Sequence, residues 1–164
     1  MRSDNSPRLA LIVLALLSCG VAAGDGSPRA MPKFRATTMD GRKFDNAAVK
    51  GRVVLLQFWA TWCQYCRRDQ SAVDTISQEF AGKGLLVLAV NAGESKMKVK
   101  QYLADSPRAV PIVLMENTNL AALFGARSYP LYVAIDTDGN IAGESKGSGG
   151  EDALRRLLRK AGLE

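Results

Sequence analysis

A pair of cysteines stands at the point where a strand-like segment is followed by a helix-like segment. Almost every residue from Val53 to Trp59 is apolar, a pattern typical of a strand buried on both faces of a sheet. Cys63 and Cys66 come next, and apolar residues then recur at helical spacing as far as Phe80. The segment therefore predicts a buried strand, a short turn and a helix over about 63–80, with the cysteine pair at the beginning of that helix.

This placement favours redox chemistry. The first turn of a helix has unpaired backbone N–H groups and the positive end of the helix dipole, which stabilise an anion there. They would stabilise a thiolate at Cys63, and only the thiolate attacks disulfides. Cys66 follows one helical turn later, so its sulfur can reach that of Cys63. We expect Cys63 to be the exposed attacking group and Cys66 to resolve the mixed disulfide, with no cofactor beyond this redox-active pair. Two incidental core cysteines, or half of a metal site, are the alternatives.

Composition excludes several other chemistries. The chain has 164 residues, 47% of them hydrophobic, which suits one globular domain. It contains no histidine, which excludes Ser–His–Asp and Cys–His catalysis, histidine-bound zinc and haem attached through a CxxCH motif. The formal net charge of +6 is spread along the chain. Because the basic residues do not gather with aromatic residues on one element, no nucleic-acid partner is predicted.

The first 23 residues are typical of an export leader. Arg2 and Arg8 precede an unbroken apolar run from Leu9 to Leu17, which is too short for a comfortable transmembrane span. Small residues then offer a signal-peptide cleavage site after Ala23. The segment ending at Cys19 also resembles the lipobox of bacterial lipoproteins, which would make Cys19 a lipid anchor. Both interpretations predict an exported protein, located in the periplasm or the cell envelope and either soluble or lipid-anchored.

Residues 24–32, rich in Gly, Ser and Pro, are predicted to be a flexible linker, and residues 33–164 to be the folded domain. Removal or lipidation of the leader leaves Cys63 and Cys66 as the two free thiols of this domain. A bridge between residues so close in sequence closes a very small loop and constrains the unfolded chain little. The pair is therefore predicted to be chemical rather than structural.

The domain alternates strand and helix patterns. Further strands are expected over 34–38, 43–45, 85–90, 112–115, 131–135 and 141–144. Further helices are expected over 96–103, 120–124 and 151–161. The turn at 39–42 makes the first two strands an N-terminal β-hairpin. This order predicts an α/β domain in which helices flank both sides of a central mixed β-sheet.

The segment Val53–Asp69, VVLLQFWATWCQYCRRD, resembles the signature of the TlpA/ResA-like branch of thioredoxin-fold proteins. The likeness continues through Pro32–Phe34, Val90–Ser95 and Ile135–Gly139 and covers nearly everything after the linker. It implies a thioredoxin-like fold and a bacterial redox protein facing the envelope. Members of this branch are usually reductases of client proteins in cytochrome c maturation or in the assembly of respiratory metal sites. A membrane electron donor would be a second partner.

The resemblance also implies roles for residues outside the cysteine pair. Pro130 corresponds to a cis-proline loop facing the cysteines, where the Tyr129 backbone would pair with an extended client peptide. An ordinary trans-proline at the start of a strand is the alternative. Trp62 is expected to form an apolar collar for the client. Asp69 stands where the family usually has glutamate and would accept the proton of Cys66; a solvated helix carboxylate is the alternative.

Three departures or unexplained matches accompany the likeness. Gln64-Tyr65 separates the cysteines where members often have a proline, and Gln57 stands where cytosolic thioredoxins hold a buried acid. Glu94 matches a family motif without an evident mechanism. The reductase direction rests on the resemblance alone, with an oxidase or isomerase as the rival. Two other classes remain open: a copper(I) metallochaperone using the same two thiolates, and a thiol peroxidase.

Overall fold

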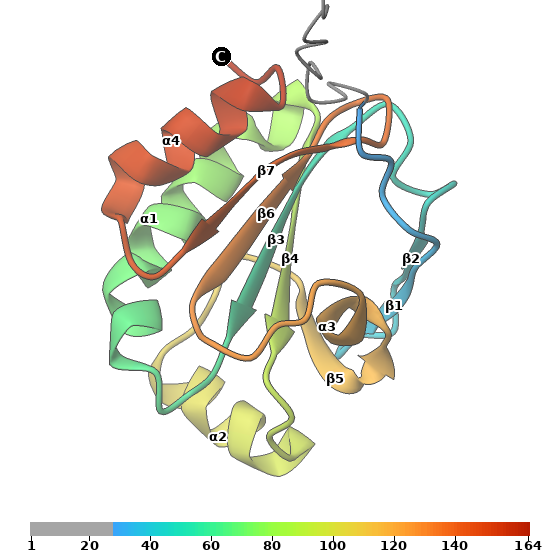
Figure 1. Cartoon of the computed structure of the whole chain (residues 1–164). Helices are drawn as coiled ribbons and strands as arrows, with labels where there is room; N and C mark the ends of the chain where they lie inside the picture. Colours follow the sequence, from blue (N-terminus) through green and yellow to red (C-terminus); the bar gives the residue numbers. More distant parts are fainter. Residues whose placement is uncertain (1–27) are drawn as a thin grey trace, which may run out of the picture.

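The structure, a computed structural model, describes residues 28–164 and is built around one mixed seven-stranded sheet (Figure 1). The strands are β1 (Arg35–Thr38), β2 (Lys43–Asp45), β3 (Val53–Trp59), β4 (Leu85–Asn91), β5 (Ile112–Thr118), β6 (Leu131–Ile135) and β7 (Ile141–Lys146). Their order across the sheet is β2-β1-β5-β4-β3-β6-β7. The strands β3, β4 and β5 are parallel, and the other pairings are antiparallel. The predicted mixed sheet and its N-terminal hairpin are confirmed.

Four α-helices are described: α1 (Gln64–Phe80), α2 (Lys96–Asp105), α3 (Leu120–Leu123) and α4 (Gly150–Lys160). A short 3-10 helix, η1 (Ala81–Lys83), follows α1. The helices α1 and α4 lie side by side on one face of the sheet, and α3 lies on the other, as predicted (Figure 1). No helix within residues 28–164 is long and apolar enough to cross a membrane.

The alternation of side chains along β3 divides the core into two layers. Val53, Leu55 and Trp59 belong to the cluster shared with α1, α2 and α4. Val54 and its alternate neighbours on β3 belong to the opposite cluster, which includes α3 and the segment before β1. Each fully buried aliphatic or aromatic side chain contributes about 1.5–3 kcal/mol relative to exposure. This central strand, buried on both faces, leads directly into the cysteine pair.

The predicted linker ends earlier than its composition indicated. Met31 is 7% exposed and its N–H donates to the Gly139 carbonyl, while the Arg29 carbonyl accepts from the N–H of Ile141. These residues extend the fold upstream of residue 33 because the open edge of the β6–β7 turn offers them backbone partners. The predicted leader, residues 1–23 with Cys19, and the first part of the linker lie outside the described residues.

Two element boundaries also differ from the sequence pattern. The strand β5 continues to Thr118 instead of Met115, because its polar end pairs with Ala36 of β1. The helix α1 begins at Gln64, since Cys63 is its N-cap residue rather than its first helical residue. Strand pairing in the tertiary structure and side-chain capping decide these boundaries, and neither can be predicted from the local periodicity of apolar residues.

Candidate active site

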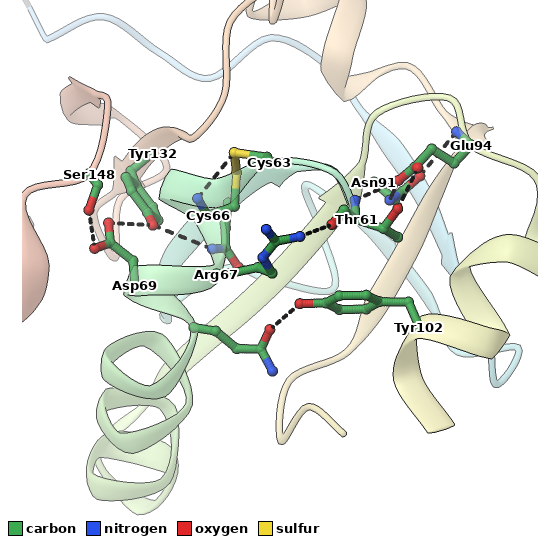
Figure 2. Close-up of a disulfide and its surroundings, with 12 residues drawn as sticks. Thr61, Cys63, Cys66, Arg67, Asp69, Asn91, Glu94, Tyr102, Tyr132 and Ser148 are labelled. Atoms are coloured by element: carbon green, nitrogen blue, oxygen red, sulfur yellow. Dashed lines mark hydrogen bonds between the residues drawn. A yellow bond between two sulfur atoms is a disulfide. The ribbon is translucent and has the colours of Figure 1, made fainter. Parts of the chain in front are cut away.

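The two cysteines are joined by a disulfide at the N-terminal end of α1 (Figure 2). After β3 ends at Trp59, the Cys63 N–H donates to the Ala60 carbonyl at 3.1 Å and closes a tight turn. The Cys63 sulfur then accepts the Cys66 N–H at 3.1 Å, which is the N-cap interaction of the helix. The Cα atoms of the two cysteines lie 5.2 Å apart. The predicted approach of the two sulfurs is therefore confirmed.

The prediction that Cys63 is exposed is wrong for this disulfide-bonded form. Cys63 is 4% exposed and Cys66 is 3% exposed. The reason is the capping geometry: the Cys63 side chain folds back over the first turn of α1, where its sulfur meets that of Cys66. The neighbouring aromatic residues Trp62 and Tyr65 are exposed instead, at 61% and 55%.

The loop before β6 lies against the residue that precedes the first cysteine. The Tyr129 ring meets the Trp62 ring edge-on, with centroids 6.1 Å apart. The Tyr129–Pro130 peptide bond is cis, as the resemblance implied, so an ordinary trans-proline is excluded. The Pro130 carbonyl accepts the Gly147 N–H at 2.8 Å, which ties the loop to the end of β7. The structure thus places the Tyr129–Pro130 loop against Trp62, the residue that directly precedes Cys63.

Asp69 is buried in the second turn of α1, with 1% of its surface exposed. Its carboxylate accepts hydrogen bonds from the Ser148 hydroxyl at 2.5 Å and the Tyr132 hydroxyl at 3.0 Å (Figure 2). It also accepts the Gly150 N–H at 3.3 Å. The interpretation of Asp69 as a solvated helix carboxylate is therefore wrong. Burial, reinforced by the charge of Asp69, raises the pKa of Tyr132, so its hydroxyl stays a proton donor to the carboxylate.

A buried polar network continues from Tyr132 through Gln57 to Arg108 and Asp74. The Gln57 amide donates to the Tyr132 hydroxyl at 3.4 Å and accepts from the Arg108 guanidinium at 3.0 Å. Arg108, whose side chain is 1% exposed, pairs with Asp74 at 3.0 Å. Gln57 therefore bridges residues far apart in sequence rather than satisfying a local hydrogen bond. Arg108 was missed by sequence reasoning because it lies in the connection before β5, where no periodicity marks a buried cation.

Glu94 is the second buried carboxylate near the site, and its contacts explain a match that sequence analysis left without a mechanism. Its carboxylate accepts the Thr61 N–H at 2.7 Å and the Thr61 hydroxyl at 2.6 Å (Figure 2). It also lies 2.7 Å from the Lys98 ammonium. Burial raises the pKa of Glu94, but hydrogen bonds from Lys98, Thr61 and Asn91 outweigh burial and lower the pKa from 4.5 to about 2. Glu94 is therefore ionised at neutral pH.

Metal ligands do not gather at this site. Within residues 28–164, no group of three or more His, Cys, Asp or Glu side chains is arranged to hold a metal ion. The groups that approach the disulfide are backbone N–H donors, aromatic rings and hydrogen-bonded carboxylates. Such a set can stabilise a thiolate, contact a peptide and accept a proton.

Comparisons with known proteins give the same class as the geometry. Over 129 residues, the chain is 27% identical to the thiol-disulfide oxidoreductase ResA of Bacillus thuringiensis subsp. konkukian (strain 97-27), covering 79% of this chain and 75% of the relative. It is 35% identical to the thioredoxin-like protein YneN of Bacillus subtilis (strain 168) over 112 residues, 67% of this chain and 65% of the relative.

Among solved structures, the exposed lipoprotein thioredoxin Etrx1 of Streptococcus pneumoniae strain TIGR4 superposes with a TM-score of 0.68 at 27% identity. The match covers 79% of this chain and 99% of that chain. The fold is therefore thioredoxin-like, and the site is that of a thiol–disulfide oxidoreductase. The family model that matches residues 25–157 is Redoxin, and the chain belongs to the Redoxin family.

Proposed function

We propose that this protein is an exported reductase of client protein disulfides in the periplasm or cell envelope. The observation that carries the proposal is the disulfide at the start of α1, whose first cysteine directly follows the exposed Trp62; the Trp62 ring contacts Tyr129 of the cis-proline loop. A redox pair next to an exposed apolar ring and a cis-proline loop suits a peptide substrate better than a small molecule. The resemblance supports clients in cytochrome c maturation or respiratory metal-site assembly.

The reaction begins with the reduced enzyme. The Cys63 thiolate, stabilised by the first-turn N–H groups of α1, attacks one sulfur of the client disulfide. The client S–S bond breaks, a Cys63–client mixed disulfide forms, and the other client sulfur leaves as a thiolate that takes up a proton. The Cys66 thiolate then attacks the Cys63 sulfur and releases the second client thiol. The client gains two electrons, and the enzyme is left in the disulfide form described above.

Asp69 is proposed to accept the proton that Cys66 loses before this second attack. It lies three residues after Cys66 on α1, one helical turn away and on the same side of the helix. Its hydrogen bond from Ser148, an exposed residue, gives the accepted proton a way to solvent. The remaining donors, Tyr132 and Gly150, hold the carboxylate in place through both steps.

Location and the source of electrons complete the proposal. The leader pattern of residues 1–23 supports export, through cleavage after Ala23 or lipidation of Cys19. A solved structural relative is described as an exposed lipoprotein, which supports the anchored form. A membrane electron donor would reduce the Cys63–Cys66 disulfide after each cycle, because the envelope is oxidising.

The test is to trap the client with Cys66→Ala. This variant keeps the attacking Cys63 but cannot resolve the mixed disulfide, so we expect thiol-reducible adducts to accumulate on the exported protein. The matched control, Cys63→Ala combined with Cys66→Ala, should form none. Mass spectrometry of the adducts identifies the clients. Equal trapping by the two variants would contradict the proposed role of Cys63.

The direction of electron flow needs a separate measurement. Equilibration of the Cys63–Cys66 couple with defined glutathione or dithiothreitol ratios gives its reduction potential. A reductase is expected to lie near the thioredoxin value of about −270 mV, and a strong envelope oxidase near about −120 mV. A value close to the second figure would overturn the reductase direction while leaving thiol–disulfide exchange intact.

A further inference from the structure

The connection between β4 and α2 directs the Glu94 carboxylate toward the redox loop, the segment 60–63 between β3 and α1. Asn91, fully buried at the end of β4, accepts the Glu94 N–H with its side-chain oxygen at 3.1 Å. The Asn91 side-chain amide in turn donates to the Glu94 carboxylate at 2.9 Å. Gly93, between them, has φ of +75°, a conformation that glycine adopts without strain. The two hydrogen bonds with Asn91 therefore orient the Glu94 side chain independently of its contacts with the redox loop.

Its main partner is Thr61, two residues before Cys63. Two of the four hydrogen-bond donors to the Glu94 carboxylate belong to Thr61, its N–H and its hydroxyl, and the others come from Asn91 and Lys98. The Glu94 side chain is 7% exposed. Hydrogen bonds to a charged acceptor are stronger than neutral ones, and burial removes the competition of water. Thr61 is therefore held by a strong two-point contact.

The same short loop is held from other sides as well. The Arg67 guanidinium, from the first turns of α1, donates to the Thr61 carbonyl at 3.1 Å. The Ala92 N–H donates to the Trp59 carbonyl at 2.8 Å, which joins the exits of β3 and β4. Figure 2 shows Glu94 and Arg67 approaching Thr61, with Cys63 immediately beyond it. Trp62, which follows Thr61 directly, is exposed although its neighbour is held.

We propose that Glu94 is a positioning residue for thiol–disulfide exchange: by holding Thr61 from the β4–α2 connection, it sets where Trp62 and Cys63 face the client. The inference deepens the proposed function and rests on it. The contact matters most in the reduced enzyme. Once the disulfide opens, the bond between the Cys63 and Cys66 sulfurs no longer holds the Cys63 side chain against α1. The hydrogen bonds of Thr61 then keep the Cys63 thiolate in position. Small misplacements of a reacting group cost large factors in rate.

Two variants remove the contact in different ways. Glu94→Gln preserves volume, but its single amide oxygen cannot serve all the donors that the carboxylate serves. Thr61→Val removes only the hydroxyl and leaves every charge in place. The matched control is Glu79→Gln. Glu79 lies near the C-terminal end of α1, where it forms an exposed ion pair with Arg155 of α4, and the variant removes the same charge as Glu94→Gln. Thr61→Val keeps the test decisive if Glu94→Gln does not fold.

The first measurement compares two substrates of the reduced enzyme: insulin, whose disulfide must dock against the protein, and glutathione disulfide, which need not. We expect Glu94→Gln and Thr61→Val to lower the rate constant for insulin about tenfold, because a docked client disulfide is then out of line with the Cys63 sulfur. The rate with glutathione disulfide should change little, and Glu79→Gln should change neither. The double variant Glu94→Gln with Thr61→Val should be no slower than Glu94→Gln alone, because both substitutions act on the same Glu94–Thr61 contact.

The second measurement is hydrogen exchange of the Thr61 amide in the reduced protein, which needs no substrate. Glu94→Gln should accelerate this exchange at least tenfold relative to Glu79→Gln. Equal exchange in the two variants, or equal losses with insulin and glutathione disulfide, would overturn the inference. If the unaltered enzyme failed to reduce insulin, the proposed function would fail instead, and amide exchange would still decide whether Glu94 holds the loop.

Discussion

Two buried carboxylates flank the disulfide, and they are built differently. Asp69 lies on the Cys66 side, and within residues 28–164 its hydrogen-bond donors are all neutral: Ser148, Tyr132 and Gly150. Glu94 lies on the loop that precedes Cys63, and one of its donors is the Lys98 ammonium. Figure 2 shows the two groups on opposite sides of the sulfur pair.

The difference supports the proposed division of roles, with proton transfer at Asp69 and positioning at Glu94. A carboxylate compensated by a cation and several donors is held in its charged form, as the low pKa of Glu94 shows, and such a group is suited to anchoring a loop. A carboxylate among neutral donors can accept a proton without leaving a cation unpaired, since hydroxyl donors can turn and become acceptors. Asp69 has that environment next to the resolving cysteine, which is where the reaction releases a proton.

The largest expected effect comes from Asp69→Asn. The variant keeps the volume of the side chain but cannot accept the Cys66 proton, so resolution of the mixed disulfide should slow about a hundredfold near pH 7. The deficit should shrink as the pH approaches the ordinary thiol pKa of about 8.5, where solvent removes the proton. Rapid-quench release of a labelled peptide from its mixed disulfide with Cys63 measures this step.

Glu94→Gln is the control for that experiment, because it also replaces a buried carboxylate by an amide. Its resolving step should slow far less than that of Asp69→Asn, because Cys66 can still lose its proton to Asp69. If Glu94→Gln slowed resolution as much as Asp69→Asn, the division of roles between the two carboxylates would be refuted.

A smaller effect concerns stability at acid pH. Because the pKa of Glu94 is lower in the folded protein than its ordinary value of 4.5, ionised Glu94 stabilises the fold above that value. This stabilisation is lost as the pH falls from about 5 toward the folded pKa of about 2. Between pH 7 and pH 3 the loss should be about 2 kcal/mol of unfolding free energy.

Urea denaturation at the two pH values measures this loss, and Glu94→Gln should lose about 2 kcal/mol less stability than the unaltered protein over the same interval. The same acid sensitivity in the protein and the variant would show that other carboxylates, and not Glu94, are responsible.

The smallest effect is expected for Tyr132→Phe. The hydroxyl joins Asp69 to Gln57, and its removal leaves two buried polar groups with one partner fewer. We expect a loss of about 1 kcal/mol of unfolding free energy in urea titration. The matched control is Tyr102→Phe, whose hydroxyl donates to Gln70 at 2.8 Å nearer the surface and whose loss should cost less. A larger cost at Tyr102 would mean that the network behind Asp69 contributes little.

Much of this molecule follows from local sequence pattern. The apolar run at β3, the period of α1 and the turn residues of the hairpins predicted a mixed sheet flanked by helices, and the structure confirms it. The cysteine pair was placed correctly at the strand–helix junction, because strand and helix periodicities are local properties of the chain. The boundaries that failed, at β5 and at the start of α1, depend on pairing with β1 and on side-chain capping.

The exposure of Cys63 and the environment of Asp69 could not be read in the same way. Burial of Cys63 depends on the sulfur folding back over α1. Burial of Asp69 depends on Ser148, from the loop after β7, and on Tyr132, from β6. Side chains that meet from distant parts of the chain leave no periodic signal, so a helix carboxylate looks solvated until its neighbours are known.

The amino-acid sequence by itself therefore determined which atoms react: two sulfurs one helical turn apart, at the end of a helix that favours an anion. Only the tertiary structure decided what surrounds them, because the contacts of Glu94 with Thr61 and of Asp69 with Tyr132 join segments that are 33 and 63 residues apart in the chain. The reactive pair is a local feature of the chain, and its control comes from the packing of the fold.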